Sequence, residues 1–570
     1  MVARPFWRDE RHDSVGHILK GDVVSDSIDY DAVVIGAGFG GLRALHDLRK
    51  MKLSTILVDA GDDVGGVWFW NRYPGARTDS EAWYYCYSFS KEILDEWNWS
   101  QRYPTQAEMA RYFEFVTDRL DLRKDIRFRT RVTGAAWDDV ANIWTVRTDD
   151  GNEFSCRYLV SAAGPLSKPY LPDFPGLDSF TGDWYQSGFW PTDEVDLSGK
   201  RVAVIGTGAS GVQIVPVVAH SAAQVTVFQR TPNYVLPARN RPIDEAERDA
   251  IKADYDNIWT RARQHFYAMD LPICEYGAAD YSAADQQRIL ERAWEIGGFR
   301  FLFDTFNDVW LDGPANEIAS EFVRSKIRAI VQNPETAELL CPKYPLAAKR
   351  PPCGHSYYEA FNRENVSLID VSENPITEIL PGGLRTATDE YDFDVIIFAT
   401  GFDAITGPAE GVDIRGRDNQ LLSEAWKTVP RTYLGLAVDG FPNFFTVAGP
   451  LGPFANGPTM VEQQAEFVTA TISFMQQNGY DAIDANPDAV AEWVQHNEEV
   501  LEGTVLANAA VANSWFLGAN IPGKPRGILA YFGGAGNYFD RITAETTSGF
   551  PGFSFSSAAE VTSQELAAYS

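Results

Sequence analysis

Two glycine-rich segments in the chain have the residue spacing of a dinucleotide-binding turn. Glycines at this spacing let the backbone turn tightly, approach a pyrophosphate and pack the following helix against the preceding strand. The unpaired N–H groups at the start of that helix then bind the anion. We therefore expect chemistry that uses two dinucleotides. Both segments read GxGxxG, with Gly36, Gly38 and Gly41 in the first copy and Gly206, Gly208 and Gly211 in the second.

Each glycine turn lies between a strand and a helix, which is the context that dinucleotide binding requires. In the first copy we expect strands at residues 31–35 and 54–58, with an apolar helical pattern between them. In the second copy the expected strands are residues 201–205 and 224–228, again separated by a helix. Two complete strand–turn–helix–strand units predict an α/β protein with two Rossmann-like domains.

The residue that follows the second strand of each unit separates the two ligands. Asp59 lies about 20 residues beyond the first glycines, where a carboxylate accepts hydrogen bonds from ribose hydroxyls, and this suits the adenosine of FAD. In the second unit, which also carries Ser210 in its turn, the strand runs into Arg230 and Thr231. Arg230 would pair with a 2′-phosphate, which favours NADPH over NADH. The alternative is that Arg230 is a solvated surface charge.

A short aromatic segment follows Asp59 and suits a flavin. It contains Gly66, Val67, Trp68 and Asn71. Glycine beside large aromatic residues allows backbone contact with a flavin and provides a wall against its ring. Packing in the hydrophobic core is the alternative role for Trp68.

The order of these motifs divides the chain into two domains. Residues 1–29 are polar and form an N-terminal extension that lacks the apolar core of a signal peptide. We expect the FAD-binding domain to comprise residues 30–165 and 390–570, and the NADP-binding domain to comprise residues 166–389. A helical pattern over about residues 242–338 predicts a helical insertion in the NADP-binding domain.

The composition excludes several classes of function. The net charge is −30, from 49 basic and 79 acidic residues, so binding to nucleic acid or to an anionic membrane is not expected. No apolar run approaches the roughly 20 residues that span a bilayer. The five cysteines have no CxxC or metal-site spacing, so we predict no metal site and a reducing, cytoplasmic location.

Together these motifs resemble one family, the type I Baeyer–Villiger monooxygenases of the cyclohexanone and phenylacetone monooxygenase kind. The resemblance extends from about residue 31 to about residue 553. Besides the glycine turns, it is carried by GGVWFWNRYPGARTD at residues 65–79, KRP at 349–351, ATGFD at 399–403 and WFLGANIPGKPR at 515–526. It implies FAD, NADPH and O2 as reactants, a peroxyflavin, and conversion of a ketone to an ester or lactone. Members of this family are often monomers.

The family fingerprint FxGxxxHxxxW(P/D) lies between the two glycine turns. In this chain it is formed by Phe180, Gly182, Gln186, Trp190 and Pro191, so glutamine replaces the family histidine. Glutamine forms neutral hydrogen bonds but cannot gain a proton. We expect a structural role for this position; if the histidine charge assists cofactor movement, NADPH oxidation would be coupled less well to product formation. The Trp-Pro ending favours the Baeyer–Villiger group over N- and S-oxygenating relatives.

The resemblance also implies a catalytic pair. Arg350 corresponds to the arginine that stabilises the peroxide anion and the oxyanion of the adduct, and Asp79 corresponds to the carboxylate that positions it. Without the resemblance, an Arg–Asp pair would be interpreted as a structural salt bridge. Lys349 corresponds to a residue that joins Arg230 at the 2′-phosphate.

Further residues are implied at the flavin, the nicotinamide and the substrate. Tyr85 corresponds to a tyrosine that contacts the flavin, although the neighbouring Tyr84 could occupy that place. Trp515 corresponds to an aromatic residue on a mobile loop over the nicotinamide, with an ordinary, partly buried tryptophan as the alternative. The expected substrate pocket contains Leu451, Gly452, Pro453, Phe454 and Trp515.

Three other functions use parts of the same pattern. An N- or S-oxygenating flavin monooxygenase shares both glycine turns but does not need Arg350. A flavin disulfide reductase would need a redox CxxxxC motif, and Cys86 has no partner nearby in the sequence. A flavin-bearing sensor would not consume NADPH. The sequence leaves small cyclic, steroidal and linear ketones open as substrates.

Overall fold

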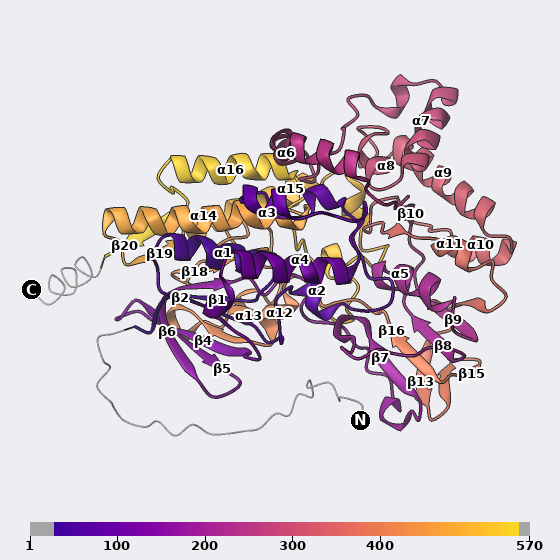
Figure 1. Cartoon of the computed structure of the whole chain (residues 1–570), viewed down its shortest axis with the longest axis horizontal. Helices are drawn as coiled ribbons and strands as arrows, with labels where there is room; N and C mark the ends of the chain where they lie inside the picture. The colour runs from indigo at the N-terminus through magenta and orange to yellow at the C-terminus, as the bar shows by residue number, and fades with distance from the viewer. Residues whose placement is uncertain (1–27, 558–570) are drawn as a thin grey trace, which may run out of the picture.

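Within residues 28–557, which the computed structural model describes, the first glycine turn belongs to an eight-stranded sheet (Figure 1). Its strands in the first third of the chain are β1 (Tyr30–Ile35), β2 (Thr55–Val58), β3 (Ile126–Arg127), β4 (Val132–Asp138), β5 (Ile143–Thr148) and β6 (Glu153–Ser161). β1 is central and pairs in parallel with β2 and β6. β4 and β5 extend the sheet in antiparallel pairing from β6. The extension predicted over residues 1–29 lies almost entirely outside the described residues.

The second glycine turn belongs to a separate sheet of five parallel strands in the described chain, in the order β12-β9-β8-β16-β7. These strands are β7 (Asp183–Gln186), β8 (Arg201–Ile205), β9 (Gln224–Gln229), β12 (Val366–Asp370) and β16 (Val395–Phe398). β8 and β16 are almost continuously apolar and buried, and β9 is buried after its first residue, as parallel strands covered on both faces require. The prediction of two Rossmann-like domains is confirmed.

The chain returns to the first sheet later than its sequence predicts. β16 follows the boundary predicted at residues 389 and 390, yet it pairs with β7 and β8 of the second sheet. The boundary therefore moves past Phe398. After it, β17 (Asp413–Arg415) pairs with β4, and β18 (Phe444–Thr446) pairs with β6, so the C-terminal part completes the first module.

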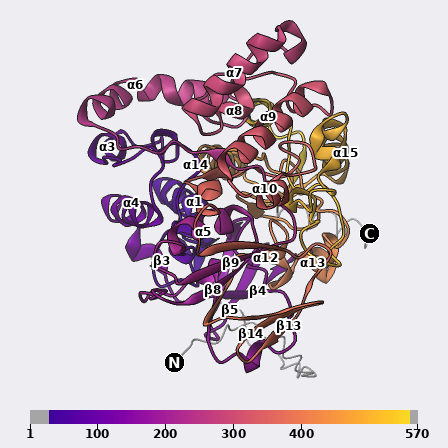
Figure 2. The ribbon, with the colours of Figure 1, turned by 90° about the vertical axis from the view of Figure 1, so that its right-hand side faces the viewer.

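The predicted helical insertion is present between β10 (Leu236–Pro237) and β11 (Cys353–Gly354). Its helices are α6 (Glu245–Gln264), α7 (Ala283–Ile296), α8 (Arg300–Phe303), α9 (Pro314–Ile330) and α10 (Pro334–Leu340). The Asn333 side chain caps α10 by accepting a hydrogen bond from the Thr336 amide at 3.0 Å. Figure 2 shows α6 to α9 gathered above the strands, where they form a lobe.

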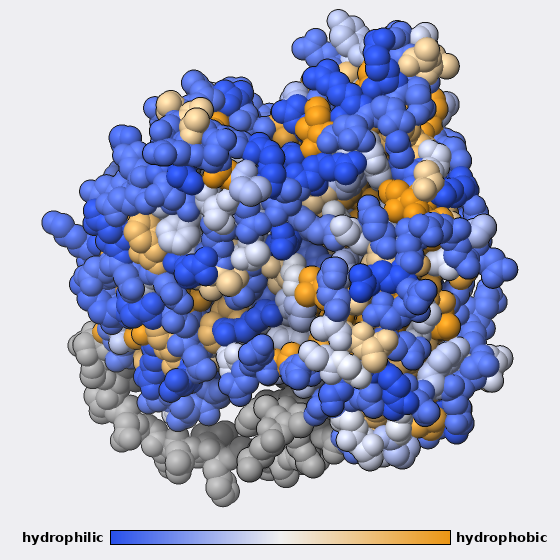
Figure 3. Space-filling model, turned by 45° about the vertical axis from the view of Figure 1, so that its right-hand side comes forward, coloured by the Kyte–Doolittle hydropathy of each residue, from blue (hydrophilic) through white to orange (hydrophobic). Residues whose placement is uncertain are grey.

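The C-terminal helices cover the first module. α14 (Gly457–Asn478) packs against α1 (Phe39–Lys50), and α16 (Ala535–Thr547) packs against α14. Arg43 of α1 lies 3.6 Å from Glu462 of α14, so a buried ion pair joins these helices. The face in Figure 3 is mostly hydrophilic, which agrees with the large net charge. In the described part of the chain, no helix combines the length and the apolar character needed to cross a membrane.

Candidate active site

Both glycine turns have the same local construction. Gly36 has a backbone φ of +100° and Gly206 has one of +113°. Residues with a side chain rarely adopt these backbone conformations. A Cβ atom at Gly36 would lie 2.5 Å from the carbonyl oxygen of Ala162, and one at Gly206 would lie 2.4 Å from that of Ala399. The backbone therefore passes close to the neighbouring strand at each turn, and glycine is required there.

The other glycines of each motif have two separate roles. Gly38 and Gly208 precede α1 and α5 (Ala209–Val218), and neither helix has a side-chain cap, so their first amides remain available to a ligand. Gly41 and Gly211 instead face the backbone of their own glycine turns. A Cβ atom would lie 1.7 Å from the Gly36 oxygen at Gly41 and 2.2 Å from the Gly206 oxygen at Gly211. These two glycines bring the helix against the turn and do not contact the cavity.

One continuous cavity of about 1090 Å³ connects the two turns. It exceeds the roughly 300–1,000 Å³ of a typical small-molecule site, so it has room for more than one ligand. The predicted site residues that line it are Gly36, Gly38, Asp59, Gly66, Val67, Trp68, Asn71, Asp79 and Tyr85 from the first module, Gly206, Gly208, Ser210, Arg230, Thr231, Lys349 and Arg350 from the second, and Gly452, Pro453, Phe454 and Trp515 from the C-terminal part.

Asp59 lies at the end of β2 beside the first glycine turn. Its carboxylate accepts hydrogen bonds from the amides of Ala37 and Gly61, both at 2.6 Å. Burial raises the pKa of Asp59, and the two amides oppose that shift by stabilising the anion. Each carboxylate oxygen keeps a second lone pair, so Asp59 can still accept from ribose hydroxyls.

Two polar atoms in the described part of the first module are available to a ligand. Asn71 Oδ1 and Asp79 Oδ1 are buried, line the cavity, and have no hydrogen-bond partner among the residues that the structure describes. Buried polar atoms are costly without a partner, so these oxygens fit a ligand with donor groups. Tyr85 lines the cavity and packs edge-on against Trp68, whereas Tyr84 is fully buried and does not line it. Of the two tyrosines, Tyr85 is therefore the one that faces the cavity.

The predicted catalytic pair is formed across the two modules. Arg350 Nη1 donates to Asp79 Oδ2 at 2.7 Å, although 271 residues separate the two in sequence. Burial, the largest cause, acts to lower the pKa of Arg350, but Asp79, Tyr267 and Cys353 together outweigh it, and the net shift is upward. Nearby, burial raises the pKa of Tyr73 to about 12, and it also raises that of Tyr267. The site thus presents a permanent cation beside neutral phenols.

Two cations of the second module line the cavity. Arg230 follows β9 and is exposed, and Lys349 is half-buried. Burial, and secondly the charge of Arg230, lowers the pKa of Lys349 to about 8. Two like charges that face one cavity form a site for an anion, and a phosphate is the anion that a dinucleotide offers.

Aromatic residues from three parts of the chain form the wall near the pair. Phe454 packs edge-on against Trp515 at 5.5 Å and against Tyr267 at 5.3 Å between ring centroids. Tyr267 comes from the helical insertion, and no motif in the sequence marks it as a cavity residue. Leu451, predicted to line the pocket, is instead buried in the core. Its φ of +60° turns the backbone so that the side chain leaves the cavity, while the three residues after it line the wall.

The motif positions of the fingerprint lie outside the cavity, although one residue between them lines it. Gln186 ends β7, and its Oε1 accepts from the Gly188 amide at 2.6 Å. Phe189, inside the fingerprint, lines the cavity and packs edge-on against Trp70 of the first module. Gln186 thus caps the turn that carries Phe189. The motif residues that do not line the cavity are Phe180, Gly182, Gln186, Trp190 and Pro191.

The chain is similar to known flavin-binding monooxygenases over most of its length. Residues 30–245 match the family model described as flavin-binding monooxygenase-like. A Baeyer–Villiger monooxygenase of Pseudooceanicola batsensis is 43% identical over 525 residues, which cover 92% of this chain and 95% of the relative. A phenazine N-monooxygenase of Lysobacter antibioticus is 41% identical over 532 residues, 93% of this chain and 97% of the relative. The NADP+-bound structure of cyclohexanone monooxygenase from Rhodococcus sp. Phi1 is 42% identical, with a TM-score of 0.90 over 93% of this chain and 99% of that one.

Two dinucleotide modules around one cavity, with a paired arginine at their junction, define a flavin monooxygenase. Similarity above 40% over nine-tenths of the chain makes the assignment more specific. The chain belongs to the Baeyer–Villiger monooxygenase family, as the sequence motifs predict.

Proposed function

We propose that this protein binds FAD in its first module and NADPH in its second, and uses O2 to convert a ketone to an ester or lactone. The observation that carries the proposal is the Arg350–Asp79 pair, which faces the cavity between the two glycine turns. One oxygen atom enters between the carbonyl carbon and its neighbour, and the other leaves as water. NADPH and one proton supply the electrons and hydrogen.

FAD, when bound, supplies the redox chemistry that activates oxygen. The protein residues hold and stabilise charge. Arg350 cannot lose its proton, so its guanidinium stabilises negative charge on oxygen throughout the reaction. Asp79 fixes the guanidinium by one charge-assisted hydrogen bond and leaves its other N–H groups to the reactants. The neutral phenols of Tyr73 and Tyr267 add no competing negative charge.

The coenzyme roles follow from the lining residues. In this proposal Asp59 binds the adenosine ribose of FAD, and the segment from Gly66 to Asn71 lies along the flavin. Arg230 and Lys349 bind the 2′-phosphate of NADPH. Trp515 and Phe454 border the nicotinamide and the ketone. Gln186 acts as a structural link.

The test is the product formed by variants of the pair. We expect Arg350→Ala to retain FAD and to lose ester formation with cyclic ketones by roughly a hundredfold or more, because the cation that stabilises the oxyanion is gone. Arg417→Ala is the matched control, since Arg417 pairs with Asp484 at 3.1 Å, outside the residues that line the cavity. Unchanged ester formation by Arg350→Ala would remove Arg350 from the mechanism.

N-oxygenation is the second candidate, because the phenazine N-monooxygenase is 41% identical to this chain. An amine nucleophile does not generate an oxyanion on carbon, so it does not need the Arg350 cation. Mass analysis of the products from a cyclic ketone and from a heteroaromatic amine separates the two activities. If only the amine is oxidised, and Arg350→Ala retains that activity, N-oxygenation replaces the main proposal.

We also propose a cytoplasmic monomer. All five cysteines, which lie within the described residues, are free thiols, and four of them are buried. Chromatography with light scattering should give the mass of a single chain, and fractionation of the source cells should place the protein in the cytoplasm.

A further inference from the structure

The two cations of the proposed 2′-phosphate site come from loops far apart in sequence. Arg230 begins the loop between β9 and β10, and Lys349 lies in the loop between α10 and β11. The two loops meet through the short parallel pairing of Leu236 with Cys353. That pairing lies after Arg230 in one loop and after Lys349 in the other. Something else must fix the earlier part of each loop.

A reciprocal pair of tyrosines performs this task. The Tyr234 hydroxyl, from the first loop, donates to the carbonyl oxygen of Tyr344 in the second loop at 2.8 Å. The Tyr344 hydroxyl donates back to the carbonyl oxygen of Pro232 at 2.8 Å. The two rings pack edge-to-face with centroids 5.6 Å apart, and both residues are buried. Each tyrosine therefore holds the backbone of the opposite loop.

Neighbouring residues extend the same connection toward the cations. The Tyr344 hydroxyl also lies 3.2 Å from Asn233 Oδ1, a second acceptor for its single hydrogen. The Asn233 side chain contacts the carbonyl oxygen of Arg350 at 3.5 Å. The buried Tyr358 hydroxyl accepts from the Val235 amide at 3.0 Å and donates to the Asn233 carbonyl at 3.2 Å. The first loop is thus held on both sides.

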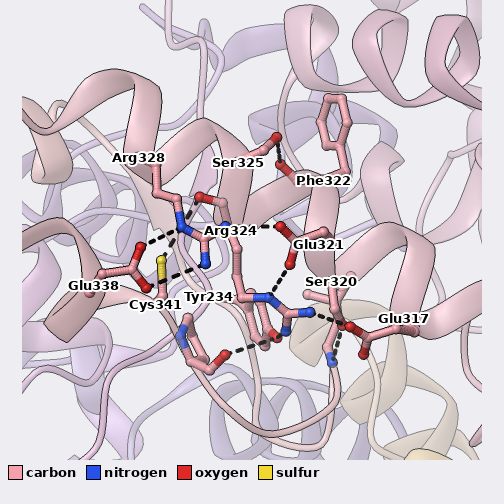
Figure 4. Close-up of polar contacts among 12 residues, drawn as sticks. Tyr234, Glu317, Ser320, Glu321, Phe322, Arg324, Ser325, Arg328, Glu338 and Cys341 are labelled. Atoms are coloured by element: carbon pink, nitrogen blue, oxygen red, sulfur yellow. Dashed lines mark hydrogen bonds and ion pairs between the residues drawn. The ribbon is translucent and has the colours of Figure 1, made fainter. Parts of the chain in front are cut away.

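The helical insertion supports the tyrosine pair from outside. Arg324 of α9 donates to the Tyr234 hydroxyl at 3.0 Å, and it is itself held by Glu317 and Glu321. Figure 4 shows the Arg324 guanidinium between these two carboxylates and the Tyr234 ring. The second loop is fixed by the same helix, because Asn316 Nδ2 donates to the Leu346 carbonyl at 2.9 Å.

The need for this support is electrostatic. The charge of Arg230 acts unfavourably on protonated Lys349. Before a phosphate arrives, like charges on two flexible side chains repel, and movement of either loop would separate them. A ligand that had to draw the loops together would lose part of its binding free energy. Loops fixed in advance avoid that cost.

We propose that Tyr234 and Tyr344 are positioning residues for coenzyme selection, which hold Arg230 and Lys349 at the separation that one 2′-phosphate bridges. The inference rests on the proposed NADPH site. It also gives the helical insertion a role in the discrimination between NADPH and NADH, at residues that do not touch either coenzyme.

The test removes single hydroxyl groups and retains the rings. We expect Tyr344→Phe and Tyr234→Phe each to weaken NADP+ binding to the FAD-loaded enzyme by roughly 3- to 10-fold, the effect of one hydrogen bond, with NAD+ binding unchanged. The same selectivity should appear with 2′,5′-ADP against 5′-ADP as probes. In turnover, the change should fall on KM for NADPH rather than on kcat. The double variant should weaken binding less than the product of the single effects, because the pair acts as a unit.

Tyr357→Phe is the matched control. Tyr357 is buried beside Tyr358, and its hydroxyl has no hydrogen-bond partner within the described residues. The Tyr357→Phe variant should therefore keep the preference of the original protein for NADP+ over NAD+. Thermal unfolding and FAD content identify any tyrosine variant that fails to fold. If one of the Tyr234 and Tyr344 variants fails to fold, the binding data of the other variant test the proposal. Equal weakening of NADP+ and NAD+, or no weakening of either, would overturn the proposal.

Arg230→Ala separates this inference from the proposed function. If Arg230→Ala weakens NADP+ and NAD+ equally, the 2′-phosphate assignment itself fails. If Arg230→Ala is selective for NADP+ while neither tyrosine variant is, only the positioning role fails.

Discussion

The pKa of Lys349 predicts that NADPH binding becomes weaker as the pH rises through 8. In the free protein the pKa of Lys349 is lowered to about 8, because the group is buried and lies near Arg230. In the proposed site, a bound 2′-phosphate, whose second pKa is about 6, is a dianion at these pH values and favours the charged lysine. Binding therefore takes up a proton whenever Lys349 is neutral beforehand.

The magnitude follows from linkage. If the phosphate restores the Lys349 pKa to its ordinary value near 10.4, NADP+ affinity should fall about tenfold between pH 7 and pH 9. Proton uptake on binding should rise from about 0.1 at pH 7 to about 0.9 at pH 9. The direction of the pH dependence follows from the lowered pKa. As the pH rises, Lys349 loses its charge in the free protein before it does so in the complex, so the affinity for NADP+ decreases.

The assay is calorimetric titration of the FAD-loaded enzyme with NADP+ in buffers of different ionisation enthalpy. Lys349→Gln is the control, since its side chain is neutral at every pH; its affinity should be weak and nearly independent of pH. NAD+ should also show little pH dependence. A flat NADP+ affinity between pH 7 and pH 9 would refute the reasoning, and so would a tenfold fall that persists in Lys349→Gln.

Two further predictions concern stability. Gly211→Ala should destabilise the second module by about 2 kcal/mol or more, because its Cβ would lie 2.2 Å from the Gly206 oxygen. In Gly208→Ala the added Cβ meets no atom within 4 Å, so this variant should fold normally but bind NADPH weakly. Urea unfolding and NADP+ titration compare the two variants. Arg43→Met should cost about 3–5 kcal/mol in the free energy of unfolding, since it leaves Glu462 buried without its cation. Thermal unfolding at neutral pH measures this loss, and an unchanged unfolding temperature would contradict it.

The sequence alone determined the local parts of this protein. Both glycine turns, the strands that precede them and the position of Asp59 follow from spacings of a few residues to about twenty. Gly36 and Gly206 could be predicted because a backbone turn of this kind requires glycine within one strand–helix connection. Arg230 could be placed in the same way, directly after a strand that the pattern defines.

Only the tertiary structure decided which distant residues meet. Strand β16 pairs with the second sheet rather than the first. The sequence did not predict this, because a short apolar run does not specify which strand it pairs with. Tyr267 reached the cavity from the helical insertion, and Leu451 turned away from it at a positive φ. Tyr234 and Tyr344 contact each other across 110 residues. Such contacts depend on how whole elements pack, and short-range preferences in the sequence do not specify that packing.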